Sequence, residues 1–119
     1  MKDSEKQYRE IFEKSPIGIL FYDKEGKLTD ANQSALEIAG IPSLNSYIGL
    51  NLFDNPQVAS RKEDLLNDGL IQFQSTLDFD NIKKFGIYTP TKSGSAFIDY
   101  TISVIDSGFL VQIQDITEG

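Results

Sequence analysis

The stretch from Tyr22 to Asn32 constrains the fold more than any other part of the sequence, because it predicts a strand, a tight turn, a second strand and a helix start in immediate succession. Asp23 and Gly26 would occupy the first and last positions of a four-residue turn. There an Asp side chain can accept a backbone N–H two residues on, and Gly accepts a positive φ angle. Asn32 stands where a helix N-cap is expected. The stretch therefore predicts a β-hairpin that leads directly into a helix, and these structural roles are sufficient to explain Asp23, Gly26 and Asn32.

The length of the chain predicts a single domain. With 119 residues, a protein buries roughly 65% of the surface that its unfolded chain exposes, which is enough for one hydrophobic core but not for two. No apolar run approaches the ~20 residues of a membrane span, and the polar N-terminus lacks the apolar centre of an export signal. We therefore expect a cytoplasmic domain over residues 15–119, preceded by a flanking helix over residues 1–14.

Charge and composition exclude several classes of function. The formal charge of −7, without a stripe of clustered Lys and Arg, argues against nucleic acid as a partner. The sequence has neither Cys nor His, so it can form no disulfide, thiolate nucleophile, imidazole base or His/Cys metal site. No Gly-x-Ser-x-Gly elbow or Walker loop is present. We expect no catalytic residue and no metal site in this segment.

One acidic run has a superficial likeness to a metal loop. Asp78-Phe79-Asp80-Asn81 resembles the start of a calcium loop, but Ile82 occupies the next ligand position and Lys83 replaces the glycine that the turn requires. Calcium binding is therefore not predicted.

The leading segment predicts a short amphipathic helix. The run from Ser4 to Gln7 fits a capping box, and Ser15-Pro16 forces the chain to become extended. Tyr8, Ile11 and Phe12 fall at i, i+3 and i+4, on one face of that helix.

Two further helices are predicted from their ends. The first covers Gln33–Ala39 and ends at Gly40. The second is capped by Asp54 or Asn55 and runs from Pro56 to about residue 67. Its expected buried stripe contains Val58, Lys62, Leu65 and Leu66.

The remaining segments predict strands. Ile17–Asp23 is apolar on both faces, which indicates a strand that is covered by the core on one side and by another element on the other. The pattern leaves open whether Gln72–Asp80 is a separate strand or an extended lead into a strand over Phe85–Thr91. A turn at Lys92–Ser95 leads into the clearest strand, Ala96–Ile105, and the final strand turns Phe109, Val111 and Ile113 inward.

The order of these elements gives an α+β fold, with an antiparallel sheet of about five strands and short helices packed on one face. This order, the stretch from Tyr22 to Asn32 and the terminal Asp115-Ile116-Thr117 resemble a PAS domain. Many PAS domains finish their last strand in an Asp-x-Thr element that joins the sensor to its output helix. The resemblance covers about residues 5 to 117.

The resemblance implies a sensory module of a larger signalling protein, most often a sensor histidine kinase of a two-component system. Asp115 and Thr117 would then relay the signal to a downstream domain in the same chain. The segment would detect a small ligand or act through dimer contacts, with Tyr8, Ile11 and Phe12 at the interface of a homodimer. The alternative is a ligand-free homodimerisation or interaction domain. The segment itself would not be an enzyme, since it has neither a phosphoacceptor His nor a nucleotide-binding motif.

PAS domains enclose a cavity between sheet and helices, and two tyrosine hydroxyls could orient a ligand there. The candidate lining residues are Ile19, Phe21, Leu36, Phe53, Leu65, Tyr88, Tyr100, Ile102, Phe109 and Val111. Haem-binding PAS domains usually need an axial His, and light-sensing flavin and coumarate PAS domains need a Cys, so the sequence disfavours these cofactors. Non-covalent flavin has no supporting motif, and the ligand stays unidentified.

Overall fold

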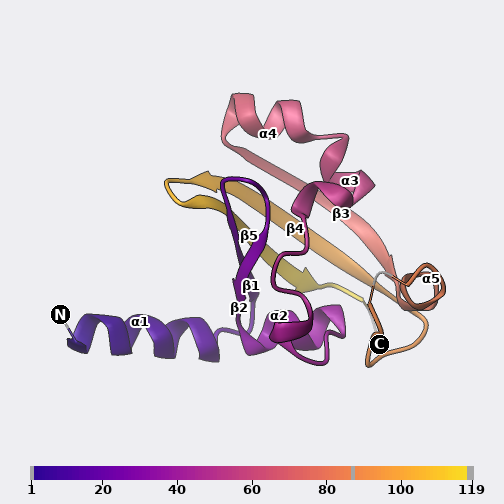
Figure 1. The fold of residues 1–119 in the computed structure, drawn as a ribbon, viewed down its shortest axis with the longest axis horizontal. Helices are drawn as coiled ribbons and strands as arrows, with labels where there is room; N and C mark the ends of the chain where they lie inside the picture. The colour runs from indigo at the N-terminus through magenta and orange to yellow at the C-terminus, as the bar shows by residue number, and fades with distance from the viewer. Residues whose placement is uncertain (1, 87, 118–119) are drawn as a thin grey trace.

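The sheet has five antiparallel strands in the order β2-β1-β5-β4-β3 (Figure 1). The computed structural model describes residues 2–86 and 88–117, with the side chains of all of these except residues 2–4 and 46. The strands are β1 (Gly18–Asp23), β2 (Leu28–Ala31), β3 (Leu70–Asp78), β4 (Ser95–Ile105) and β5 (Gly108–Asp115). The helices are α1 (Lys2–Lys14), α2 (Gln33–Ala39), α3 (Pro56–Ala59), α4 (Lys62–Asp68) and α5 (Phe79–Lys84), with 3₁₀ turns at Leu44–Ser46 and Leu52–Asp54. This architecture confirms the predicted α+β class.

The β1–β2 hairpin has the predicted turn chemistry. The Asp23 Oδ1 atom accepts the backbone N–H groups of Glu25 and Lys27, each at 2.9 Å. The Gly26 N–H donates to the Asp23 carbonyl at 2.9 Å, and Gly26 has a φ angle of +88°. Because L-residues rarely adopt this angle, the turn depends on glycine at position 26. The hairpin thereby places β2 so that its end leads directly into α2.

The hydrophobic core lies between the sheet and the helices α2, α3 and α4. Strand β1 alternates, so that Leu20 and Tyr22 are buried in this core while Phe21 is part of the opposite face. The helices contribute buried side chains to the same cluster, among them Ala35, Val58 and Leu65. One continuous apolar layer therefore joins all five strands to the covering helices.

The outer face of the sheet is covered in part by α1, which projects beyond the sheet at the N-terminal end (Figure 1). Phe12 is only 2% exposed, and its ring stacks on Phe21 with the centroids 5.6 Å apart. Helix α1 begins at Lys2, ahead of the Ser4 that was expected as its cap. The leading helix is thus the second cover of the strand that is apolar on both faces.

The helix predicted from Pro56 to about residue 67 is in fact two helices. Asn55 caps α3, but Arg61 has φ −111° and ψ 10°, which interrupts the helix before α4 begins. The Arg61 Nη1 atom donates to the Gln57 carbonyl at 2.7 Å, so the side chain turns back onto α3. The break also changes the buried face, because Leu66 is 55% exposed and does not join the predicted buried stripe.

The predicted strand over Phe85–Thr91 is wrong, and Gln72–Asp80 belongs mostly to a separate strand. Strand β3 pairs with β4 from Leu70↔Ser103 to Asp78↔Ser95. Helix α5 follows at once because the Asp78 Oδ1 atom accepts the Asn81 N–H at 3.0 Å and caps it. Phe79 and Ile82 anchor this unpredicted helix in the core. Residue 87, within the predicted strand, lies outside the described residues.

Candidate functional site

Most of the predicted cavity residues are gathered in the core between sheet and helices. Two predicted members are corrected, because Ile19 and Phe21 point to the outer face of the sheet, where Phe21 packs against Phe12. Alternation along a strand requires this once Leu20 and Tyr22 face inward. The other predicted residues belong to the core cluster or pack against it: Leu36, Phe53, Leu65, Tyr88, Tyr100, Ile102, Phe109 and Val111.

Two tyrosines flank the central row of the inner sheet face. Leu20 of β1, Val111 of β5 and Ile102 of β4 are in register and form that row. Tyr22 lies two residues from Leu20 in one direction, and Tyr100 lies two residues from Ile102 in the other. Residues on the same face of a strand are about 6.8 Å apart, so tyrosine side chains can lean over the row from both ends.

The pKa values place the tyrosine hydroxyls in one apolar environment. Burial raises the pKa of Tyr22 above its usual range, and the nearby Tyr100 raises it further. Burial also raises the pKa of Tyr100 to about 12. The pKa of Tyr88 is raised by burial and then by Tyr47, Tyr100 and Tyr22. The four hydroxyls therefore lie near one another, and these groups stay neutral at physiological pH.

Two of these hydroxyls have no protein partner. The Tyr88 hydroxyl donates to the Ala39 carbonyl at 2.8 Å. Among the described residues, the hydroxyls of Tyr22 and Tyr100 make no hydrogen bond, although no fully enclosed side-chain oxygen or nitrogen lacks a partner. Neither hydroxyl oxygen is therefore fully enclosed, and each keeps some surface that water can reach. Sequence reasoning missed Tyr22, although its alternation with Leu20 would have identified it.

Asn32 forms the joint between α1, β1 and α2. Its side chain is 0% exposed. The Oδ1 atom accepts the N–H groups of Ile19 and Ala35, each at 2.9 Å. The Nδ2 group donates to the carbonyls of Phe12 at 2.7 Å and Ile17 at 3.0 Å. The predicted helix cap is confirmed, and the same amide also fixes the end of the leading helix.

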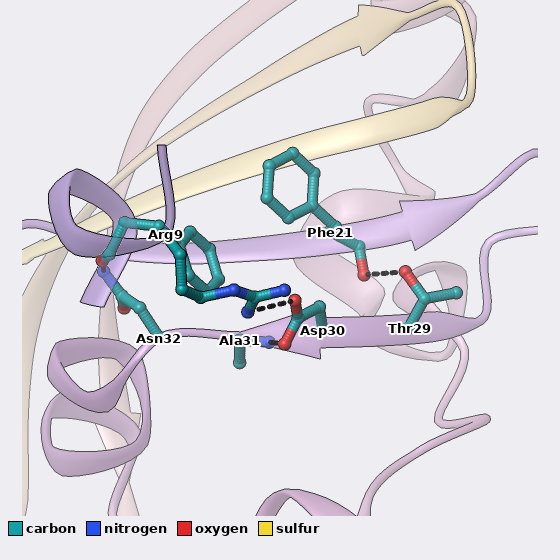
Figure 2. A network of polar contacts seen from close by, with 7 residues as sticks. Arg9, Phe21, Thr29, Asp30, Ala31 and Asn32 are labelled. Atoms are coloured by element: carbon teal, nitrogen blue, oxygen red, sulfur yellow. Dashed lines mark hydrogen bonds and ion pairs between the residues drawn. The ribbon is translucent and has the colours of Figure 1, made fainter. Parts of the chain in front are cut away.

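Beside this joint, the outer surface carries an ion pair and a groove. Arg9 of α1 approaches Asp30 of β2 at 3.4 Å (Figure 2). An open groove of about 400 Å³ adjoins it, lined by Tyr8, Phe21, Tyr22, Asp23, Thr29, Asp30 and Ser107. Asp23 and Asp30 already accept hydrogen bonds from neighbouring backbone N–H groups. The carboxylates that line the groove therefore stabilise the hairpin.

Two cations lie over aromatic rings at the junction of α3 and α4. The Arg61 Cζ atom is 4.2 Å from the centre of the Phe73 ring, and the Lys62 Nζ atom is 4.6 Å from that of Phe53. Such contacts stabilise a cation while its charge stays solvated. Among the described residues, neither side chain forms an ion pair. Both therefore contribute to the cover of the core without placing a charge inside it.

The predicted relay residues form a hydrogen-bonded clasp at the end of β5. The Asp115 Oδ1 atom accepts the Thr117 N–H at 2.8 Å, and these contacts with Thr117 hold the pKa of Asp115 below its usual range. The Thr117 Oγ1 atom accepts the Phe97 N–H at 2.7 Å. The Ile116 N–H donates to the Phe97 carbonyl at 2.9 Å. The segment after β5 is thus held against β4.

The dimer candidates separate into two groups. Tyr8 and Ile11 are 51% and 64% exposed, whereas Phe12 is buried against the domain's own sheet. Phe12 is therefore removed from the candidate interface.

No helix in the described part of the chain is long and apolar enough to cross a membrane. Within the same residues, no cluster of acidic side chains is suited to hold a metal ion.

Comparison with known proteins identifies the family. The PAS domain model matches residues 6–71, and the chain belongs to the PAS domain family. A PAS domain from Colwellia psychrerythraea has a TM-score of 0.73 at 18% identity, covering 97% of this chain and 98% of that chain. A PAS domain of an HTR-like protein from Haloarcula marismortui has a TM-score of 0.66 at 13% identity, covering 98% and 100%.

A third similar structure is a PAS domain from a two-component sensor histidine kinase. It has a TM-score of 0.70 at 8% identity, covering 97% of this chain and 99% of that chain. Among curated proteins, no sequence match to this chain is found. The likenesses show the PAS fold, and membership of the family makes this chain a sensory domain.

Proposed function

We propose that this PAS domain is the cytoplasmic sensor segment of a larger signalling protein, of the sensor histidine kinase type, and that it detects a small molecule between sheet and helices. The observation that supports the proposal is the pair of tyrosines on the inner sheet face, Tyr22 and Tyr100, whose hydroxyls make no hydrogen bond within the described residues. The similarity to a PAS domain of a sensor histidine kinase supports the proposed setting.

The proposed relay runs from Tyr100 to the end of the domain. Tyr100 and Phe97 both belong to β4, and the Phe97 backbone holds Ile116 and Thr117. A ligand that prefers one position of β4 relative to β5 would therefore bias the direction in which the chain leaves the sheet. This requires the ligand to bind the two arrangements with different affinity.

The first test of ligand binding is native mass spectrometry of the purified domain, compared with the same sample after denaturation. A reproducible excess of mass that denaturation releases is the expected result. The bare domain mass from freshly purified protein would instead favour the ligand-free alternative.

The relay is tested by Asp115→Ala in the full-length protein that contains this domain. The substitution removes the carboxylate that orients Thr117, so the signal response should be lost while the fold stays intact. Because the clasp is solvent-exposed, we expect the free energy of unfolding to fall by at most about 1 kcal/mol. Asp106→Ala, in the exposed β4–β5 turn, is the matched control. A response preserved in Asp115→Ala would contradict the relay.

A second candidate function is homodimerisation through α1, which the exposure of Tyr8 and Ile11 favours. Deletion of residues 1–14 is a poor test of this alternative, because it also removes Phe12 and one acceptor of Asn32. Ile11→Glu is sharper, with Ile48→Glu as control, since Ile48 is also exposed. In analytical ultracentrifugation, Ile11→Glu should dissociate a dimer that the control leaves intact. Equal dimerisation of both variants would exclude this interface.

A further inference from the structure

One edge of the sheet is protected against pairing with another chain. Strand β2 is only 4 residues long, and its pairing with β1 is irregular. The segment after α2 covers its outer side, where the Leu28 N–H donates to the Leu50 carbonyl at 2.9 Å and the Leu28 carbonyl accepts the Gly49 N–H at 3.0 Å. Proteins protect sheet edges in these ways because an open edge is a template for a further strand. The β2 edge is therefore closed.

Strand β3 forms the opposite edge of the sheet (Figure 1) and is built differently. It is 9 residues long and pairs with β4 without a register shift, from Leu70↔Ser103 to Asp78↔Ser95. The run Leu70–Leu77 contains neither a charged residue nor a proline, although the whole chain has a formal charge of −7. A long, regular and uncharged edge is the kind that accepts another strand.

The hydrogen bonds at both ends of the β3–β4 pairing identify which residues of β3 bond to β4. Just before β3, the Val104 N–H donates to the Gly69 carbonyl at 2.9 Å. Just after β3, the Phe79 N–H donates to the Gly94 carbonyl at 2.9 Å. In an antiparallel pair, opposite residues alternate between those that exchange hydrogen bonds and those that do not. The odd-numbered residues of β3 therefore bond to β4.

The even-numbered residues of β3 direct their backbone N–H and carbonyl groups away from β4, toward the open edge. Gln72, Gln74 and Thr76 lie in the middle of this edge, and their side chains are exposed on the outer face. Within the described residues, no hydrogen bond occupies the backbone groups of these three residues. The edge can therefore add one antiparallel strand without disturbing the sheet.

We infer that the open edge of β3 pairs with the same edge of a second copy of this chain, across a two-fold axis. Antiparallel pairing centred on Gln74, the midpoint of β3, places Gln72 opposite Thr76 of the second copy. It joins even-numbered residues to even-numbered residues, as the open backbone groups require. A two-fold contact of this kind uses the same surface on both copies. This contact goes beyond the proposed function, since it depends neither on a ligand nor on α1.

The side chains of β3 favour a copy of the same strand over a charged partner. In the register centred on Gln74, Ile71 lies opposite Leu77 of the second copy on the inner face, so two apolar side chains meet. On the outer face, the amides of Gln72 and Gln74 and the hydroxyl of Thr76 can hydrogen-bond across the pair. Because Leu70–Leu77 is uncharged, the edge neither repels its own copy nor attracts a charged strand.

The expected dimer is weak. The contact is a single pair of strands about 30 Å long, and its area is smaller than the roughly 800 Å² per partner of a stable interface. We therefore expect a dissociation constant of about 0.1 to 1 mM, which is typical of a transient contact.

The inference is tested by NMR of the domain over a dilution series, with sedimentation velocity on the same samples. As the dimer forms, the amide protons of Gln72, Gln74 and Thr76 should shift and exchange more slowly with solvent, because they become hydrogen-bonded. The amide protons of Ile71 and Phe73 already bond to β4, so they should exchange slowly at every concentration.

Substitutions at the centre of the edge locate the contact. Gln74→Pro removes an N–H that points away from β4, a position where an edge strand tolerates proline, and it should abolish the dimer. Gln74→Lys places two ammonium groups opposite each other and should weaken the dimer about fivefold. Gln114→Lys, exposed on the outer face of β5, is the matched control for the change of charge and should leave the dimer intact. Circular dichroism establishes that each variant is folded.

Three results would overturn the inference. The first is a domain that stays monomeric up to about 1 mM. The second is a dimer that Gln74→Lys weakens no more than Gln114→Lys does, a comparison that needs no proline variant. The third is a dilution series in which the amide signals of Tyr8 and Ile11 shift while those of β3 do not, because the contact would then belong to α1.

Discussion

At the scale of single residues, Asn32 has the largest structural consequence. As a helix cap, Asn32 needs only its Oδ1 atom. Its Nδ2 group also donates hydrogen bonds to the carbonyls of Phe12 and Ile17. Asn32→Ala would leave these buried backbone groups without partners, so we expect the free energy of unfolding to fall by about 3 kcal/mol. Urea denaturation measures this change.

The control for that prediction is Asn55→Ala, which removes the half-buried cap of α3 and should cost only about 1 kcal/mol. Asn32→Asp separates the two halves of the joint, because it keeps the acceptor but turns a carboxylate oxygen toward the carbonyls of Phe12 and Ile17. Equal losses of stability in Asn32→Ala and Asn55→Ala would show that Asn32 acts as a helix cap alone.

At the scale of elements, the sequence predicts the helices and turns whose determining residues lie within the element itself. The β1–β2 turn and α2 depend on Asp23, Gly26, Asn32 and Gly40, whose preferences act within a few residues, and these predictions are confirmed. Helix α5 has equally local signals, an Asp78 cap and buried Phe79 and Ile82, but its six residues are too few for the sequence pattern to distinguish a helix from the end of a strand.

The break between α3 and α4 is a feature that the local sequence pattern does not predict. Residues 56 to 67 satisfy a helical pattern throughout, and the interruption at Arg61 accompanies a tertiary contact, that of its guanidinium with the Phe73 ring. The prediction of the candidate site residues on β1 is wrong for a similar reason. Alternation does not distinguish the inner face of β1 from the outer one when both faces are apolar, so the sequence pattern puts Phe21 inside, whereas the structure puts Tyr22 there.

At the scale of the whole molecule, the buried tyrosines couple the stability of the fold to alkaline pH. The folded-state pKa values of Tyr22, Tyr88 and Tyr100 lie above the usual value of 10.0. Between the unfolded and folded values, the unfolded chain releases protons that the folded domain retains. The free energy of unfolding should therefore be insensitive to these groups below about pH 9 and fall as pH rises above about 10, by at most about 1.4 kcal/mol per pH unit for each tyrosine.

Urea denaturation between pH 8 and pH 11.5 measures this slope, with phenolate absorbance near 295 nm reporting ionisation in the same samples. Tyr100→Phe removes one raised pKa and should flatten the slope above pH 10, whereas Tyr8→Phe, at the exposed ring, should not. A slope that is identical in Tyr100→Phe and Tyr8→Phe would mean that the inward tyrosines ionise without unfolding the core, and hence that their hydroxyls are in contact with bulk water.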